Sequence, residues 1–406
     1  MSKDSTSAFV EEAKGVLHDL RSALAGLVAA VGADATQPQE IARRFGLDKT
    51  LTWKIARVIC DDDTMASAVH VPGRSSVRNL VETLGRNGAP TESTTLVQDA
   101  MDRLEQLIET HCGDRRTFEV MLGGSSNGAA SKQAENARKM FYQGASAIWG
   151  VQARVHASLH FVAPSEDESK LDLGVIAGFL GFRRLRADVP WTVASMSTFV
   201  QDGTPKEHQA LRPMDPGLRP GSAPLLKRFC TSPEPQLRET PGRNSTTRYE
   251  LAEGPIGNTA ATNCILGWVA GGEVCRYRSP GDLIGEHVVR LSTPVEVLYH
   301  DLYVHRSLGF AMNPTIHLYS DLPGGPIFPY DGPERGRLPV LDEVVDLGEN
   351  PPNASAADIP NYRQMVSFGA EQMGWTLNDF RGFRFRLKYP PIPTLAVYRY
   401  DLPEKA

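Results

Sequence analysis

QPQEIARRFGLDKTLTWKIARVIC, residues 37–60, is the stretch whose spacing decides how the first part of this chain folds. It predicts two short helices joined by a tight turn. Pro38 suits the first position of a helix, and Thr36 is available to cap that helix. Gly46 can take the left-handed conformation that ends it, and the carboxylate of Asp48 can cap the second helix.

The second of these helices has two chemically distinct faces. Apolar residues three to four apart predict the face that enters the core: Leu51, Ile55, Val58 and Ile59. The remaining side chains are cationic, hydroxyl and aromatic groups, which are the kinds that contact phosphates and base edges: Lys49, Thr50, Thr52, Trp53, Lys54 and Arg57.

The order Ile41, Ala42, three residues, Gly46 and Leu47, followed by an amphipathic helix, resembles the helix-turn-helix of bacterial transcriptional regulators. The segment GLDKTLTWKIARVI is similar to the recognition helix of winged members such as the IclR-type repressors. In that superfamily Ala42 would lie where the two helices cross closely, and Gly46 would make the turn. The resemblance is confined to residues 37–60.

One position departs from the family's pattern. The apolar residue usually expected midway along the recognition helix comes one place early, at Leu51, and Thr52 stands where Val or Ile is common. The resemblance implies that one group of side chains enters the major groove of double-stranded DNA: Lys49, Thr50, Thr52, Trp53, Lys54 and Arg57. It further implies that Arg43 and Arg44, with Arg74 as a further candidate, hold phosphates. A plain helical hairpin that touches no DNA is the alternative interpretation of the same spacing.

Length and composition bound these interpretations. A chain of 406 residues accommodates two or three domains, and 41% hydrophobic with 22% charged residues is typical of a globular protein. The net charge of -5 argues against a protein coated in nucleic acid, so any DNA contact must come from a local patch. Residues 36–60 supply a modest patch, with five cationic side chains against two carboxylates.

The N-terminus and the cysteines indicate a cytoplasmic protein. MSKDSTSAFVEEAKG is polar and acidic, where a signal peptide would be basic and then apolar. No stretch approaches the ~20 apolar residues that a membrane-spanning helix needs. The five cysteines are odd in number and widely spread, and they form no CxxC pair, so neither a zinc finger nor a disulfide framework is expected.

The periodicity changes near Gly150. Before it, helical spacing recurs at residues 7–31, 75–88, 91–112 and 132–149, with no alternating strand pair where a wing would be expected. After it, VQARVHASLHFVAP alternates as a strand does. The sequence therefore predicts an α+β protein, with a helical domain over residues 1–150 and a β-rich α+β domain over residues 151–406 that senses a ligand, dimerises or binds a partner.

Several elements are expected in the second domain. Strands are predicted at residues 191–200, 246–251, 264–269, 287–291, 295–303, 315–319, 383–387 and 395–400, and helices at residues 171–180 and 361–373. Two proline-rich stretches, residues 201–243 and 324–356, lack periodicity. Loops of this length are usually lids, partner-binding surfaces or insertions.

The histidines of the second domain do not predict a metal site. His156 and His160 share one face of a strand but would lie roughly 13 Å apart by the rise per residue. His300 and His305 have opposite parity, so a straight strand would direct them to opposite faces. No P-loop, dinucleotide fingerprint or nucleophile elbow is present, so the sequence predicts no catalytic residue, no cofactor and no metal.

Three functions remain open at this point. The first is a homodimeric DNA-binding regulator whose second domain binds a small-molecule effector or dimerises, since aromatic residues are numerous enough there to line a pocket. The second is an assembly protein whose helical region is a protein-interaction module. The third is an enzyme in the β-rich half, for which no catalytic set can be named.

Overall fold

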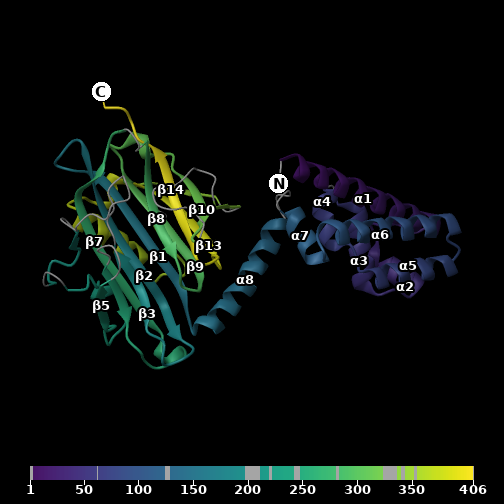
Figure 1. Cartoon of the computed structure of the whole chain (residues 1–406), viewed down its shortest axis with the longest axis horizontal. Helices are drawn as coiled ribbons and strands as arrows, with labels where there is room; N and C mark the ends of the chain where they lie inside the picture. The colour runs from purple at the N-terminus through teal and green to yellow at the C-terminus, as the bar shows by residue number, and fades with distance from the viewer. Residues whose placement is uncertain are drawn as a thin grey trace. The chain divides into compact units, whose positions relative to one another are not determined.

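The computed structural model describes residues 3–61, 63–123, 129–196, 211–218, 222–241, 247–279, 283–322, 336–339, 343–351 and 354–405. The chain divides into two compact units, Met1–Ala134 and Glu135–Ala406. The first is helical and the second is rich in strands (Figure 1). The chain is therefore α+β, as its sequence predicts.

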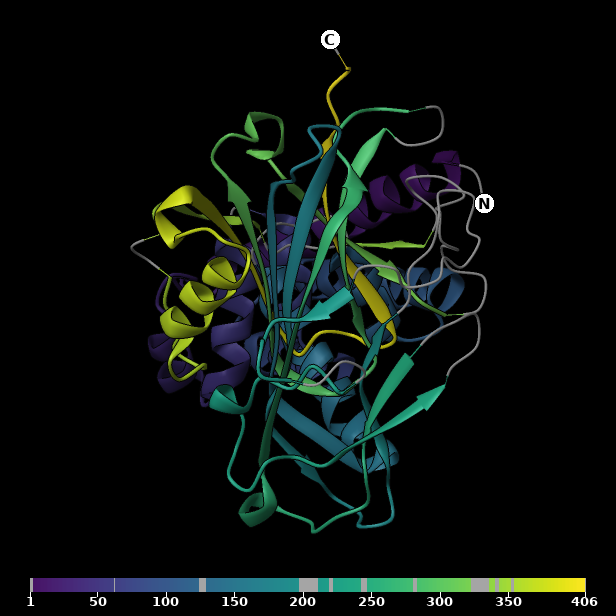
Figure 2. The ribbon, with the colours of Figure 1, turned by 90° about the vertical axis from the view of Figure 1, so that its left-hand side faces the viewer.

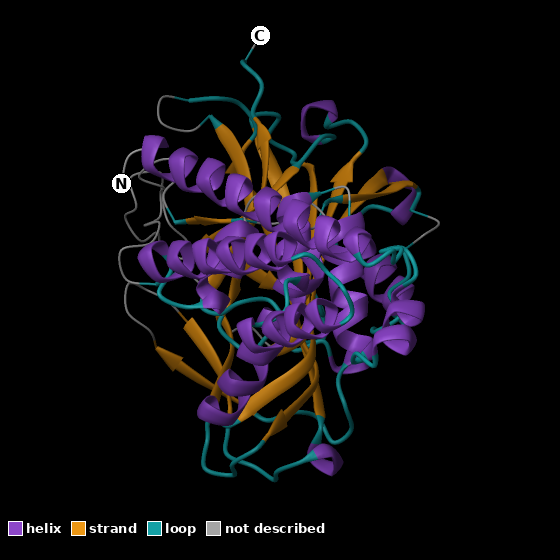
Figure 3. Ribbon diagram, turned by 90° about the vertical axis from the view of Figure 1, so that its right-hand side faces the viewer, coloured by secondary structure: helices purple, strands orange, loops and turns teal. Residues whose placement is uncertain are grey.

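The first unit contains helices α1 (Lys3–Ala30), α2 (Pro38–Phe45), α3 (Lys49–Cys60), α4 (Thr64–Ser67), α5 (Arg74–Arg86), α6 (Thr91–His111) and α7 (Arg115–Gly123). The long helices α1 and α6 lie side by side, and the unit is drawn entirely in helix and loop (Figure 3). Leu20, Leu24 and Leu27 of α1 are fully buried in one apolar cluster with Leu84 and Leu104. Where a winged helix would carry a hairpin, the described residues after α3 form helices and turns, as predicted.

The turn between α2 and α3 has the geometry that its sequence predicts. Pro38 is the first residue of α2, and Gly46 has a φ of 67°. The side chain of Asp48 accepts a hydrogen bond from the Leu51 amide at 3.0 Å, which caps α3. The predicted cap of α2 is wrong, because the Thr36 hydroxyl donates to Asp34 instead and no side chain caps that helix.

Helix α8 (Ala129–Trp149) lies at the division between the units. Its second half packs against the β-rich unit, where Tyr142 and Ser146 are buried. The compact units therefore divide at Ala134, before the end of this helix, whereas the change from helix to strand falls near Gly150, as the periodicity indicates.

The second unit contains three sheets and one further helix. Its strands are β1 (Val151–Pro164), β2 (Lys170–Arg184), β3 (Trp191–Met196), β4 (Leu211–Pro213), β5 (Leu237–Pro241), β6 (Thr247–Leu251), β7 (Thr262–Cys275), β8 (Ile284–Leu291), β9 (Val295–His305), β10 (Thr315–Ser320), β11 (Arg337–Leu338), β12 (Val345–Glu349), β13 (Phe380–Lys388) and β14 (Thr394–Asp401), and the helix is α9 (Tyr362–Gln372). The strand orders are β12-β13-β9-β1-β2-β7-β4, β11-β10-β14-β8 and β3-β6-β5. Strands β1 and β9 pair in parallel, and the other neighbouring strands of the large sheet are antiparallel.

Both faces of the large sheet are covered. Helix α9 lies against one face (Figure 2), where Phe161 of β1 packs with Met365 and Val366. On the other face, Val162 and Leu298 share a cluster with residues of β8 and β14. The alternation of β1 is thus confirmed, because successive residues enter different cores.

One element of the second unit differs from its prediction. Residues 171–180 are predicted to be helical but form most of β2, paired with β1 and β7. A short apolar run that is buried on both faces has no periodicity to separate strand from helix. Gly178 marks the close approach of β7, because a Cβ there would lie 2.0 Å from the carbonyl oxygen of Cys264.

The remaining strand and helix predictions are largely confirmed. Strands occur at 247–251, 262–275, 284–291, 295–305, 315–320, 380–388 and 394–401, and a helix occurs at 362–372. Residues 197–200 of one predicted strand, and much of both proline-rich stretches, lie outside the described residues. None of the described helices is long and apolar enough to cross a membrane.

Candidate nucleic-acid interface

Helix α3 presents a continuous stripe on the side away from its core. Ile55 and Val58 are 2% and 1% exposed, which fixes one side of the helix in the apolar cluster. Lys49, Trp53 and Arg57 follow one another at four-residue spacing and are exposed. Beside this stripe, two more of the residues predicted to contact DNA, Thr50 and Lys54, are exposed and half-buried respectively.

Thr52 does not belong to this surface. Its side chain is 1% exposed, and its hydroxyl donates to the carbonyl oxygen of Lys49 at 3.2 Å. Together with Leu51 it widens the buried face of α3. This explains why the apolar residue of the motif stands at Leu51, one place earlier than is usual in the family that the motif resembles. The prediction that Thr52 enters the groove is therefore wrong for this conformation.

The aromatic ring of Trp53 packs with two neighbouring side chains, His70 and Arg57, and the three form a small cluster. Trp53 is 45% exposed, and the ring of His70 meets it edge-on with centroids 5.3 Å apart. The guanidinium carbon of Arg57 lies 5.5 Å from the Trp53 ring centroid, within range for a cation–π interaction. Partial burial, and then the positive charge of Arg57, lower the pKa of His70; the carboxylate of Asp61 acts to raise it, and Lys54 acts to lower it. The net lowering disfavours a positive charge on the imidazole beside the two cations.

The cations of the exposed side of α2 and α3 lack ion pairs with described carboxylates. Across the described ranges, Arg43, Lys49, Lys54 and Arg57 form no ion pair with a carboxylate. By contrast, Arg103 of α6 pairs with Asp19 of α1 at 3.0 Å. The positive charge of the stripe is therefore not matched by an ion pair with a described carboxylate.

Two of the predicted phosphate ligands have structural partners. Arg44 donates to the carbonyl oxygens of Gly32 and Val31 at 2.8 and 3.0 Å, which ties α2 to the end of α1. Arg74 pairs with Asp102 at 2.6 Å and with Glu105. Its charge is matched by these carboxylates, so Arg74 is removed from the candidate phosphate-binding set.

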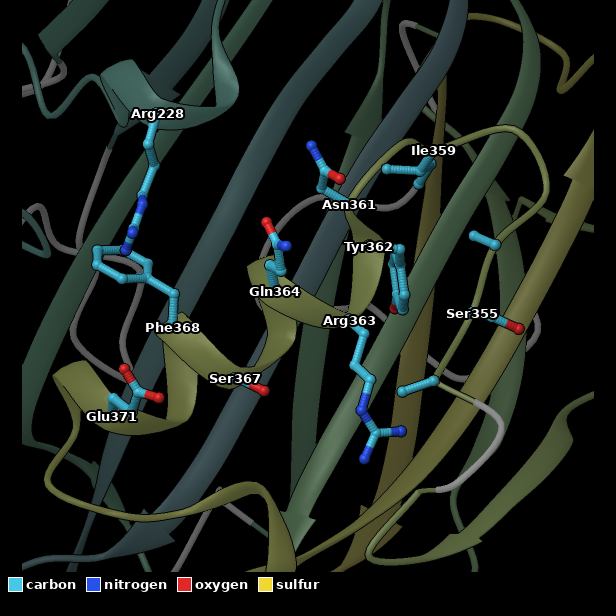
Figure 4. Close-up of a pocket in the computed structure, with 12 residues that line it drawn as sticks. Arg228, Ser355, Ile359, Asn361, Tyr362, Arg363, Gln364, Ser367, Phe368 and Glu371 are labelled. Atoms are coloured by element: carbon cyan, nitrogen blue, oxygen red, sulfur yellow. The ribbon is translucent and has the colours of Figure 1, made fainter.

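A pocket of about 660 Å³ lies beside α9 in the second unit (Figure 4). Arg228 and Arg363 bring positive charge to its lining, and the Arg228 guanidinium carbon lies 5.0 Å from the Phe368 ring centroid. Glu371 is the carboxylate among its lining residues, which include neither histidine nor cysteine. The lining can bind an anionic ligand but offers no evident set for acid–base or nucleophilic chemistry.

A buried ion pair lies beneath this pocket. Asp301 of β9 is 0% exposed and accepts from Arg384 Nη2 at 2.7 Å and from the hydroxyl of Tyr362, a pocket residue. Tyr362 in turn shares a hydrogen bond of 2.9 Å with Tyr303. Burial raises the pKa of Asp301, while Arg384 and Tyr362 act to lower it. Since these groups satisfy one another, we assign them to the framework of the pocket.

The histidines of the second unit lie where their parity predicts. His160 and His300 are buried on the face of the large sheet that meets β8 and β14, with ring centroids 5.0 Å apart. His305 lies apart from them, against the ring of Trp375. In the part of the chain that the structure describes, no group of three or more potential ligands is arranged to hold a metal ion.

Comparisons with known proteins do not assign the chain to a family. No family model matches it, and no curated protein matches it. One solved structure, a "putative protease" from Parabacteroides distasonis ATCC 8503, is similar with 8% identity and a TM-score of 0.26. The match covers 62% of this chain and 40% of that one. A likeness this slight carries no argument about fold or function.

Proposed function

We propose that this protein is a sequence-specific DNA-binding regulator in which α3 lies in the major groove. The observation that carries the proposal is the exposed stripe of Lys49, Trp53 and Arg57, on a helix that follows the tight turn at Gly46. A single α-helix fits the width of the major groove. The proposal places the protein in the cytoplasm.

The chemistry of the stripe matches what base edges require. Arg57 and Lys49 can donate to guanine O6 and N7, and the apolar edge of Trp53 can contact a thymine methyl group. Arg43, on the preceding helix, is exposed and suits a phosphate. Because one short helix reads too few base pairs for useful specificity, the regulator would act as a pair of chains.

The second unit would supply regulation. The pocket beside α9 lies within the size range of small-molecule sites, roughly 300–1,000 Å³. Arg228 and Arg363 favour an anionic effector, and the Phe368 ring packs against the Arg228 guanidinium at the edge of the pocket. We infer that this is the place at which an effector would bind.

The test is selection of bound fragments from random duplex DNA by the full chain. We expect one recurring motif from the wild type and loss of its enrichment for the double variant Lys54→Ala, Arg57→Ala, with the folded structure intact by circular dichroism. Arg116→Ala removes an exposed cation from α7 and serves as the matched control. If the double variant recovers the same motif as the wild type, α3 is not the reading helix. A large homo-oligomer without salt-dependent DNA binding would instead favour a protein-interaction module.

A further inference from the structure

Helix α8 has an apolar outer face that no described residue of the β-rich unit covers. Met140, Phe141 and Ile148 are 55%, 48% and 71% exposed. On the other side of the helix, Tyr142 and Ala145 are 8% and 6% exposed and pack into the β-rich unit. The helix is therefore anchored by one face while the opposite face remains open.

The open face carries no charge. With about 3.6 residues per turn, a sector of roughly 120° contains only apolar and small residues over residues 136–148: Ala137, Met140, Phe141, Gly144, Ala147 and Ile148. The residues that flank one side of it, Asn136 and Gln143, are uncharged amides. The solvent-facing side of a helix is ordinarily polar or charged, and contiguous exposed apolar surface marks an interaction site.

We propose that this face is the surface through which two copies of the chain pair. The six residues are self-complementary about Gly144, as a two-fold contact requires. In an antiparallel crossing centred there, Phe141 of one copy lies opposite Ile148 of the other, on one side of the contact. On the other side, Met140 lies opposite the small side chain of Ala147. Each pair is matched in height to within about 1.5 Å, one residue's rise.

Gly144 permits the close approach that this crossing needs. A Cβ built on Gly144 would have no atom within 4 Å, so the space above it is open. Small residues at a helix crossing let the two backbones approach while larger neighbours interlock around them. The absence of charge in the sector and on its amide flank also fits a second, equally uncharged copy better than a charged partner.

The size of the apolar face of α8 sets the expected strength of dimerisation. Three turns of one helix bury less than the ~800 Å² per partner of a standard interface, so we expect dimers to form in the micromolar range. Because the contact is apolar, its strength should change little with salt, unlike binding to DNA. The inference rests on the proposed function only in what the dimer is for, which would be to bring two α3 helices to one DNA site.

Sedimentation of the full chain without DNA tests the pairing. Between about 1 and 100 µM, the range in which weak complexes assemble, we expect the wild-type mass to rise toward twice that of one chain. Phe141→Glu should remain monomeric, and Leu283→Glu, at a 58% exposed apolar residue just before β8, should behave as wild type. A wild type that stays monomeric throughout, or a Phe141→Glu variant that dimerises equally well, overturns the proposal. Neither result bears on DNA binding, which is measured separately on a single half-site.

A cross-link tests the position of the two-fold axis. In a Cys60→Ser background, which removes an exposed thiol, Gly144→Cys should form a disulfide-linked dimer on mild oxidation. Gln143→Cys, about 100° away around the helix, should not. Equal cross-linking of the two variants, or none at Gly144, shows that the helices do not cross there.

Discussion

The guanidinium of Arg57 and the ring of Trp53, one helical turn apart on α3, lie 5.5 Å from each other on the exposed side of that helix. The His70 ring supports Trp53 from its edge. The cation is thereby held on a surface instead of moving freely in solvent. A guanidinium that is already positioned loses less conformational entropy when it binds a base edge.

Replacing Trp53 with alanine should weaken DNA binding more than it weakens the fold. The ring is 45% exposed, so its loss removes limited buried area. Losing a base contact costs about 1–3 kcal/mol, or roughly five- to 150-fold in affinity, and losing the support of Arg57 adds to this. Fluorescence anisotropy with a selected duplex measures the effect. Trp53→Phe retains a ring and should keep more of the affinity than Trp53→Ala; equal losses would show that the ring does not position Arg57.

Arg43 and Arg44 are adjacent in sequence and should differ in phenotype. Arg43 is exposed without an ion pair to a described carboxylate, so Arg43→Ala should weaken binding to all sequences and reduce the salt slope by about 1. Arg44 donates to two carbonyl oxygens at the end of α1, so Arg44→Ala should cost about 1–2 kcal/mol in the free energy of unfolding. Salt titrations and urea denaturation of both variants separate the two roles. A larger loss of stability in Arg43→Ala than in Arg44→Ala would contradict the assignment.

Thr50 and Thr52 provide a matched pair of threonines on α3. Thr52→Val keeps the shape of a buried side chain, so DNA affinity should be unchanged and stability should shift by about 1 kcal/mol or less. Thr50→Val removes an exposed hydroxyl from the proposed surface and should lower affinity severalfold. Binding titrations on the same duplex compare them. A loss confined to Thr52→Val would mean that α3 presents another face to DNA.

Local chemistry made the turn around Gly46 predictable from sequence. Its φ of 67°, the Asp48 cap and the Pro38 start each follow from what one residue type can do. The predicted role of Thr52 failed because its burial depends on how α3 is rotated against the rest of the unit. The sequence shows that the apolar stripe of the motif is shifted by one residue, to Leu51. It does not show that the Thr52 hydroxyl is buried as a result.

Two features of the second unit could not be predicted from the sequence pattern. The predicted helix around Gly178 is a central strand, because its neighbours on both sides come from segments distant in sequence. The pairing of Asp301 with Arg384 likewise joins residues 83 positions apart and follows from the register of β9 and β13. No local spacing signals either arrangement. Both were accessible only once the strand order was known.

Breaking the Asp301–Arg384 pair should be strongly destabilising. Asp301→Asn leaves the guanidinium of Arg384, whose side chain is 11% exposed, without its compensating charge. Removing one partner of a buried pair typically costs about 3–5 kcal/mol, whereas Tyr362→Phe, which removes one hydrogen bond to the same carboxylate, should cost about 1–3 kcal/mol. Chemical denaturation measures both. Losses of equal size would show that the charge pair contributes no more than the tyrosine does.

The β-rich unit should lose stability as the pH falls from 7 toward 4.5. Burial, with His300 as a neighbour, lowers the pKa of His156 and His287 to about 3, and burial lowers that of His300 to about 4. The unfolded chain binds protons at these sites below about pH 6.5 while the folded chain does not, so each site costs about 2 kcal/mol at pH 5. His156 packs against Phe179, so a phenylalanine should be accommodated at this position. His156→Phe should therefore reduce the slope of the free energy of unfolding against pH by the contribution of one bound proton. Urea denaturation at a series of pH values, followed by a signal from the β-rich unit, gives the slope; an unchanged slope in this variant would show that His156 is not kept neutral by the fold.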